Sequence, residues 1–152
     1  MRKKLICLAV ALLLCAATLA AYAEGGTFAL RFDEGFTMSL PEGWVSYPAG
    51  NGPIRYALGP GDGARFLYIQ VQPTDIDNPD AMREAIEKSG QCGKTSPLEL
   101  NGKDFAAFVA PDLNASGCAT IHNGELITFL FTPQDDSEYM LLAAQIMAGI
   151  KF

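Results

Sequence analysis

The residues that could carry acid–base or nucleophilic chemistry are few, and their spacing fits no common catalytic arrangement. His122 is the only histidine in the 152-residue chain, so a Ser-His-Asp triad would have to use it. It directly precedes Asn123-Gly124, a dipeptide typical of tight hairpin turns, and no Gly-x-Ser-x-Gly motif occurs. We therefore expect His122 to be an exposed turn residue. The sequence favours a protein that is not an enzyme, with no cofactor and no dedicated metal site.

Acidic residues are numerous, and one cluster resembles the start of a calcium-binding loop. Asp75, Asp77 and Asp80 lie close together in the sequence. An EF-hand loop needs oxygen ligands at its first, third and fifth positions and glycine at the sixth. Counted from Asp75, the fifth residue is Pro79 and the sixth is Asp80, so the pattern fails. Helix capping explains these acids, while weak divalent-cation binding at the surface stays open.

An aromatic group gives the clearest candidate for a binding surface. Phe66 and Tyr68 alternate with the apolar residues of the stretch 67–71, so they lie on the opposite face of a predicted strand. Tyr56 belongs to the strand expected just before it. If a helix covers these rings they are core residues, but uncovered they form the kind of aromatic patch that marks a binding surface. Phe66, Tyr68 and Tyr56 are therefore the candidate binding residues.

The first 23 residues have the features of a secretory signal peptide. Arg2, Lys3 and Lys4 precede an apolar run from residue 5 to about 17, and Ala21-Tyr22-Ala23 fits a cleavage site. The apolar run is shorter than the ~20 residues that span a bilayer. We expect cleavage after Ala23, a single mature domain over residues 24–152, and a secreted or periplasmic location without a stable membrane span.

Export changes how the charge and the cysteines are interpreted. Loss of three basic residues leaves eight Lys and Arg against 17 Asp and Glu, a net charge of −9. Such a surface repels phosphate backbones, so we expect no nucleic-acid partner. Cys92 and Cys118 remain, and a pair in an oxidising compartment predicts a disulfide worth roughly 3–4 kcal/mol. Two free buried thiols, or a metal pair lacking further ligands, are the alternatives.

The elements expected around these residues are mostly strands. In "FTMSLPEGW" (36–44), alternating apolar residues predict a strand that Pro41 ends and Gly43 turns, so that Trp44 plugs the core. Two further runs, 54–58 and 67–71, predict a hairpin. Asn-Gly dipeptides at 101–102 and 123–124 predict two more hairpins. The second strand of each hairpin is apolar on both faces, which favours a central position in a sheet.

Two helices complete the predicted set. Asn78 and Pro79 have the types expected at an N-cap and a first helical position, and Gly90 follows the amphipathic stretch. The segment "EYMLLAAQIMAGI" (138–150) predicts a strongly apolar helix, with Asp135 as its N-cap and Gly149 at its end. Such a helix can cover an apolar sheet face.

This order of elements, with "FTMSLPEGW" early and "AAQIMAGIKF" last, resembles the PsbP-like superfamily over most of residues 35–152. The resemblance implies an α+β fold, in which a central antiparallel β-sheet is flanked by helices as an α/β/α sandwich. Members act mostly as assembly or binding partners, and no functional residue is carried over. The sequence thus favours an exported non-catalytic domain that binds a protein or an envelope component. A small-ligand or divalent-cation carrier is the alternative, and a small hydrolase comes third.

Overall fold

The computed structural model describes residues 26–152, so the expected signal peptide (1–23) lies outside the described residues. The described chain contains nine strands and two α-helices in an order close to that predicted. The elements are β1 (Thr27–Arg31), β2 (Thr37–Pro41), β3 (Val45–Tyr47), β4 (Ile54–Gly59), β5 (Phe66–Pro73), α2 (Pro79–Lys88), β6 (Ser96–Leu100), β7 (Lys103–Ala110), the 3-10 turn η1 (Pro111–Leu113), β8 (Ala115–His122), β9 (Glu125–Thr132) and α3 (Ser137–Ala148).

Seven strands form one antiparallel sheet in the order β3-β4-β5-β9-β8-β7-β6, and β1 and β2 form a separate hairpin. The predicted Asn-Gly turns are confirmed, because Asn101 and Asn123 have φ angles of 51° and 50° and the glycine after each is also positive. This geometry suits a type I′ turn, whose twist matches that of the flanking strands. β9 is the central strand of the seven, as its two apolar faces require.

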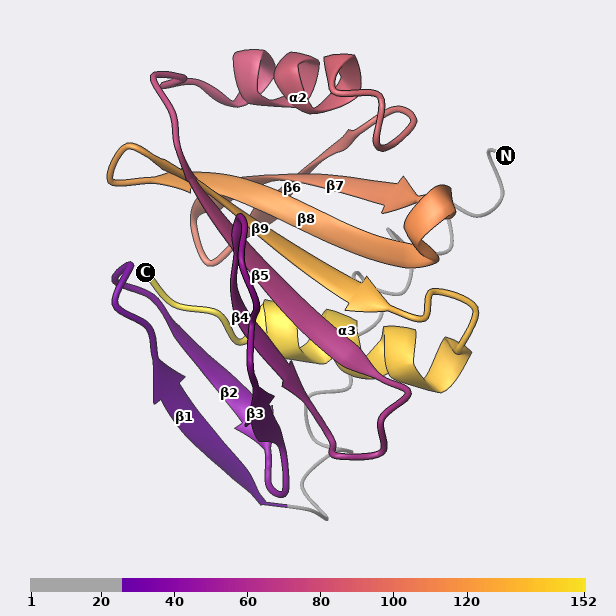
Figure 1. Cartoon of the computed structure of the whole chain (residues 1–152). Helices are drawn as coiled ribbons and strands as arrows, with labels where there is room; N and C mark the ends of the chain where they lie inside the picture. Colours follow the sequence, from indigo (N-terminus) through magenta and orange to yellow (C-terminus); the bar gives the residue numbers. More distant parts are fainter. Residues whose placement is uncertain (1–25) are drawn as a thin grey trace.

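The helices and the β1–β2 hairpin cover the sheet unequally. α2 lies over β6, β7 and β8 on one face, while α3 and the hairpin share the other face (Figure 1). The fold is therefore mostly antiparallel sheet with two helices. The expected α/β/α sandwich is met only in part, because α3 shares one face with a hairpin and, among the described residues, no helix lies over β3, β4 and β5 on the other face.

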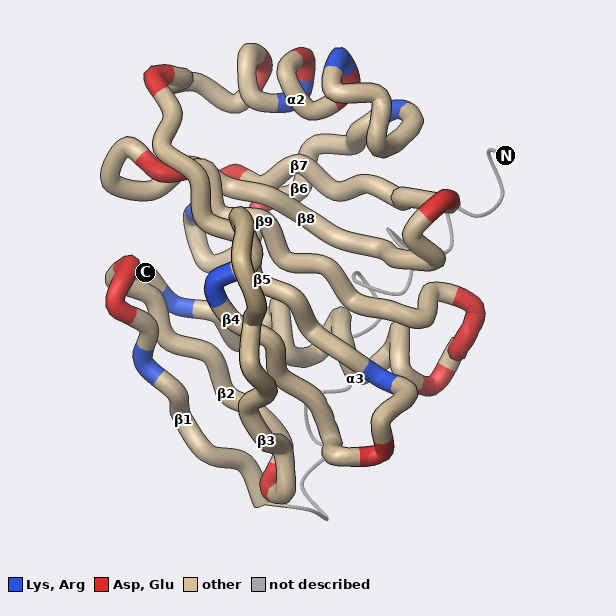
Figure 2. The backbone as a smooth tube through the Cα atoms, in the orientation of Figure 1, with Lys and Arg blue, Asp and Glu red and all other residues tan. Residues whose placement is uncertain are grey.

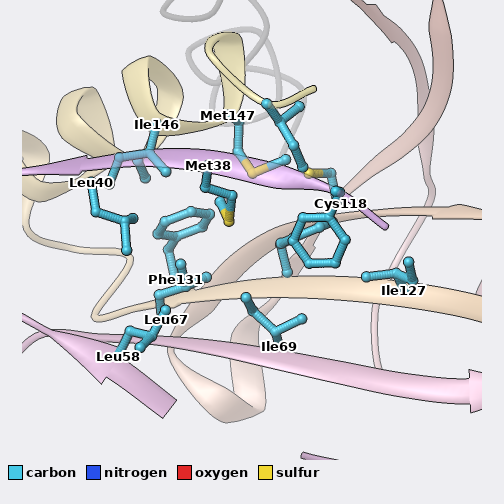
Figure 3. Close-up of a cluster of buried hydrophobic side chains, with 14 of the residues drawn as sticks. Met38, Leu40, Leu58, Leu67, Ile69, Cys118, Ile127, Phe131, Ile146 and Met147 are labelled. Atoms are coloured by element: carbon cyan, nitrogen blue, oxygen red, sulfur yellow. The ribbon is translucent and has the colours of Figure 1, made fainter. Parts of the chain in front are cut away.

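The main core lies between the sheet, α3 and the hairpin. Met38 and Leu40 of the hairpin are fully buried there against sheet residues and against Ile146 and Met147 of α3 (Figure 3). Trp44 belongs to this cluster and is only 8% exposed. The prediction that Trp44 is a core residue is thus confirmed.

The predicted disulfide between Cys92 and Cys118 is wrong, since both cysteines are free. The side chain of Cys118 lies in the main core on the α3 side of the sheet (Figure 3), whereas Cys92 packs on the α2 side. The alternation of β8 causes this separation, because Ala119 faces α2 and its neighbour Cys118 must face away. Burial raises the pKa of the Cys118 thiol to about 12, so it remains protonated.

Both helix N-caps are formed by side chains. Asn78 Oδ1 accepts a hydrogen bond from Ala81 N at 2.8 Å, as predicted for α2. For α3 the N-cap is Asp136, which accepts from Tyr139 N at 2.9 Å, and the prediction of Asp135 was wrong by one residue. Asp135 instead accepts a hydrogen bond from Asn114 Nδ2 at 3.1 Å, which ties the loop before α3 to the turn before β8.

Candidate binding face

The part of the sheet that α2 does not cover carries a row of aromatic rings. The β4–β5 register sets Tyr68 beside Ala57, and the β3–β4 register sets Ala57 beside Tyr47, so these three side chains share one face. The rings of Phe66 and Tyr68 stack at 5.6 Å, and Tyr47 meets Phe66 edge to face at 5.4 Å. We call Tyr47, Phe66 and Tyr68 the aromatic face.

The rings of the aromatic face are partly exposed, because no helix formed by residues 26–152 lies over this part of the sheet. Val45 continues the same side of β3 and is 45% exposed. Charged residues lie mainly in turns and on α2, and the middles of β5 and β9 are free of charge (Figure 2). The face is therefore apolar and uncharged within an acidic chain.

Tyr56, the third residue expected at this site, lies on the opposite face of the sheet. It is set beside Ile69 of the main core, and its ring meets that of Phe32 at 4.9 Å. Its hydroxyl donates to Glu34 Oε2 at 2.9 Å, and Arg55 Nη1 donates to Glu34 Oε1 at 2.6 Å. Burial and the Glu34 carboxylate raise the pKa of Tyr56 to about 12. Tyr56 thus helps to hold the β1–β2 turn against β4 and does not join Phe66 and Tyr68.

A groove adjoins the aromatic face where α2 meets the uncovered strands. It has a volume of about 210 Å³ and runs between α2 and the side chains of β5 and β9. β8 lies between β9 and β7 and presents Ala115, Gly117 and Ala119 to this side ahead of Ile121, so little side-chain volume fills this part of the space. Gly117 is required there, because an added Cβ would lie 2.4 Å from the carbonyl oxygen of Phe129.

His122 is half-buried and not the fully exposed turn residue that was expected. Its ring packs edge to face against Phe152 at 4.8 Å, and its Nδ1 accepts a hydrogen bond from Lys103 Nζ at 3.2 Å. Burial and the neighbouring Lys103 charge lower the pKa of His122. No hydrogen bond within residues 26–152 links His122 to a serine hydroxyl or a carboxylate, so this part of the chain forms no triad around it.

The acidic cluster does not form a metal centre. Asp80 pairs with Arg83 in the first turn of α2, and Asp77 accepts a hydrogen bond from Asn78 Nδ2 at 3.2 Å. Within the described part of the chain, no group of three His, Cys, Asp or Glu side chains could hold a metal ion. Nor does the described chain contain a helix of the length and apolar character needed to cross a membrane.

Comparison with solved structures identifies the type of fold. No protein-family model matches the chain, and no curated protein matches it. The solution structure of cyanobacterial PsbP (CyanoP) from Synechocystis sp. PCC 6803 superposes with a TM-score of 0.57 at 10% identity, over 87% of this chain and 95% of that chain. A crystal structure from Bacteroides thetaiotaomicron VPI-5482 has a TM-score of 0.46 at 12% identity, over 76% of this chain and 44% of that one.

The chain therefore has a PsbP-like fold, as the sequence resemblance implied. The likeness covers most of both chains, and at 10% identity it is a likeness of fold alone. Sequence reasoning correctly selected Phe66 and Tyr68 as residues of one face, but it missed the groove. The small residues of β8 were the only sequence signal for the groove. They indicate a groove only when the strands on either side of β8 are known.

Proposed function

We propose that the mature chain is an exported, non-catalytic binding module that recognises a protein or another envelope component through the aromatic face. The observation that carries the proposal is the row of Tyr47, Phe66 and Tyr68 rings on a sheet face that neither α2 nor α3 of the described chain covers. Aromatic residues are enriched in interfaces and dominate binding energy there, because they bury a large area with few rotatable bonds.

Two further features support this function. The signal-peptide pattern of residues 1–23 supports an extracytoplasmic location. β5 has no charged residue and β9 has only Glu125 at its start, and charged residues are likewise depleted in the centres of protein interfaces. His122 accepts a hydrogen bond from Lys103 and packs against Phe152, and these contacts favour a structural role. His122 is also the residue that the most common catalytic arrangements would need.

The test is a double substitution, Phe66→Ser with Tyr68→Ser, in a tagged chain expressed in the organism that encodes it. Chemical cross-linking and mass spectrometry then compare the captured molecules. Loss of two central aromatic contacts should weaken capture by roughly 30-fold or more. Phe28→Ser and Leu141→Ser are matched controls, because these residues are 38% and 46% exposed on β1 and α3. Undiminished capture by the double variant would show that the aromatic face is the wrong surface.

A carrier of a small ligand is the second candidate, and the groove beside α2 is the observation that favours it. Ligand sites are concave, largely apolar and supplied with a few polar groups, and the groove has these properties. The divalent-cation form of this hypothesis gains no support from Asp75, Asp77 and Asp80, whose carboxylates are used in part by helix contacts. A thermal shift assay with calcium or manganese tests the cation form directly. A cation carrier should unfold at a higher temperature with the metal, and EDTA should abolish this increase.

A further inference from the structure

The groove beside α2 is continuous with the aromatic face. Tyr68 of the aromatic face is set beside Leu130, and Leu130 also lines the groove. Moving along β5 away from Tyr68, the same face presents Gln70 and then Gln72, both of which line the groove. A ligand that occupies the groove can therefore extend along β5 onto the aromatic rings.

The polar groups of the groove are placed as neighbours by the sheet register. Gln70 is set beside Thr128, and Gln72 is set beside Leu126. Directly opposed residues have Cβ atoms about 4.5–5.5 Å apart, so two amides and a hydroxyl line one continuous strip. Within the described chain, no hydrogen bond engages the side chains of Gln70, Gln72 or Thr128, which leaves them available to a ligand.

Most of the other residues that line the groove are apolar, and the polar Ser89 and Gln91 line it where α2 ends. Ile86 projects from α2, Leu126 and Leu130 come from β9, and Phe108 comes from β7. None of the described residues that line the groove is charged. The one titratable group, the Cys92 thiol, has a raised pKa because of burial and the nearby Glu87 carboxylate, so it is neutral as well.

These properties limit what the groove can hold. A charged ligand would be desolvated without any partner of opposite charge, which is costly. A purely hydrocarbon chain would cover Gln70, Gln72 and Thr128 and leave their hydrogen-bonding groups unpaired. The fitting ligand is uncharged, has hydroxyl or amide groups along its edges, and has apolar C–H surfaces that can contact Leu130 and the aromatic rings.

We propose that the groove and the aromatic face together bind an uncharged oligosaccharide, with Gln70, Gln72 and Thr128 hydrogen-bonding to its hydroxyl groups. This inference rests on the proposed function, because it assigns a ligand class to the same surface. A sugar chain meets each requirement, since its rings carry hydroxyl groups on their edges and C–H groups on their faces. The acidic residues outside the groove, including those of α2, would in addition disfavour anionic glycans.

The test is a titration of the ¹⁵N-labelled chain (residues 24–152) with two probes, an uncharged β-1,4-linked tetramer of N-acetylglucosamine and maltotetraose. Binding of either one should give saturable shifts in the side-chain amide resonances of Gln70 and Gln72. The Gln70→Ala, Thr128→Ala double variant should bind about tenfold or more weakly. Gln134→Ala is the matched control, because Gln134 lies before α3 and does not line the groove. The dispersed spectrum of each variant shows that it is folded.

Three outcomes would overturn the inference. The first is that neither oligosaccharide gives a saturable shift at millimolar concentration. The second is that the Gln70→Ala, Thr128→Ala variant shows the same shifts as the unchanged chain. The third is that only a fatty acid, tested in parallel, gives saturable binding in the groove. Failure here is distinct from failure of the proposed function. If the oligosaccharides do not bind but Phe66→Ser with Tyr68→Ser still abolishes capture, the aromatic face stands and the ligand class is wrong.

Discussion

Replacing Trp44 by alanine tests whether this residue supports the fold or belongs to a site. Trp44 is 8% exposed, and its ring lies 6.4 Å from that of Tyr139 in α3. A buried aromatic side chain removes roughly 150–250 Å² from water, which corresponds to about 4–6 kcal/mol at ~25 cal/mol per Å². Alanine keeps part of that contact and the core relaxes, so we expect a loss of about 3–5 kcal/mol in the free energy of unfolding.

The assay for this change is urea denaturation followed by far-ultraviolet circular dichroism, because the variant has no tryptophan to report by fluorescence. The midpoint of thermal unfolding should fall by roughly 10–20 °C. Val45→Ala is the control, since the neighbouring Val45 is 45% exposed and its truncation should change stability by less than about 0.5 kcal/mol. A loss below about 1 kcal/mol for Trp44→Ala would refute the assignment of Trp44 to the core.

Three further predictions follow from the described residues. The purified mature chain (residues 24–152), denatured without reductant, should show two titratable thiols, since Cys92 and Cys118 lie on opposite faces of the sheet. A result of no titratable thiol would restore the disulfide. Gly117→Ala should lower the free energy of unfolding by about 1–3 kcal/mol, because the added Cβ would lie 2.4 Å from a β9 carbonyl oxygen. The control Gly93→Ala should be near neutral, since nothing lies within 4 Å of its added Cβ. Equal losses of stability in the two variants would contradict this packing. The single histidine, His122, should titrate by NMR below the ordinary value of about 6.5. Its neutral form therefore stabilises the fold above that value and loses this contribution as pH falls through the lowered pKa, and a midpoint at or above 6.5 would contradict the contact with Lys103.

Local sequence signals predicted the elements well. Asn101-Gly102 and Asn123-Gly124 determine tight turns, because few other dipeptides accept positive φ at both positions. Asn78 and Pro79 likewise marked the start of α2 through their own backbone and side-chain chemistry. These features depend on residues next to each other in the chain, so the sequence alone was enough to place them.

Long-range pairing could not be predicted in the same way. Alternation correctly put Phe66 and Tyr68 on one face of β5, but only the strand order shows that α2 lies elsewhere. The sequence pattern does not separate Tyr56 from these two residues, because no local signal gives the register between β4 and β5. Cys92 and Cys118 fit a disulfide by number and compartment, but the sheet lies between them. Register and face are set by contacts between segments far apart in sequence.

The most direct test of the binding face is site-specific photo-cross-linking in the native organism. A photoreactive amino acid replaces Tyr68 in one variant and Leu141 in another, the latter being 46% exposed on α3. If the aromatic face is the binding surface, the probe at position 68 should give discrete adducts that the probe at 141 does not. Adducts from position 141 alone would contradict the account. So would the absence of adducts from position 68 when the chain without a photoreactive residue still captures a partner.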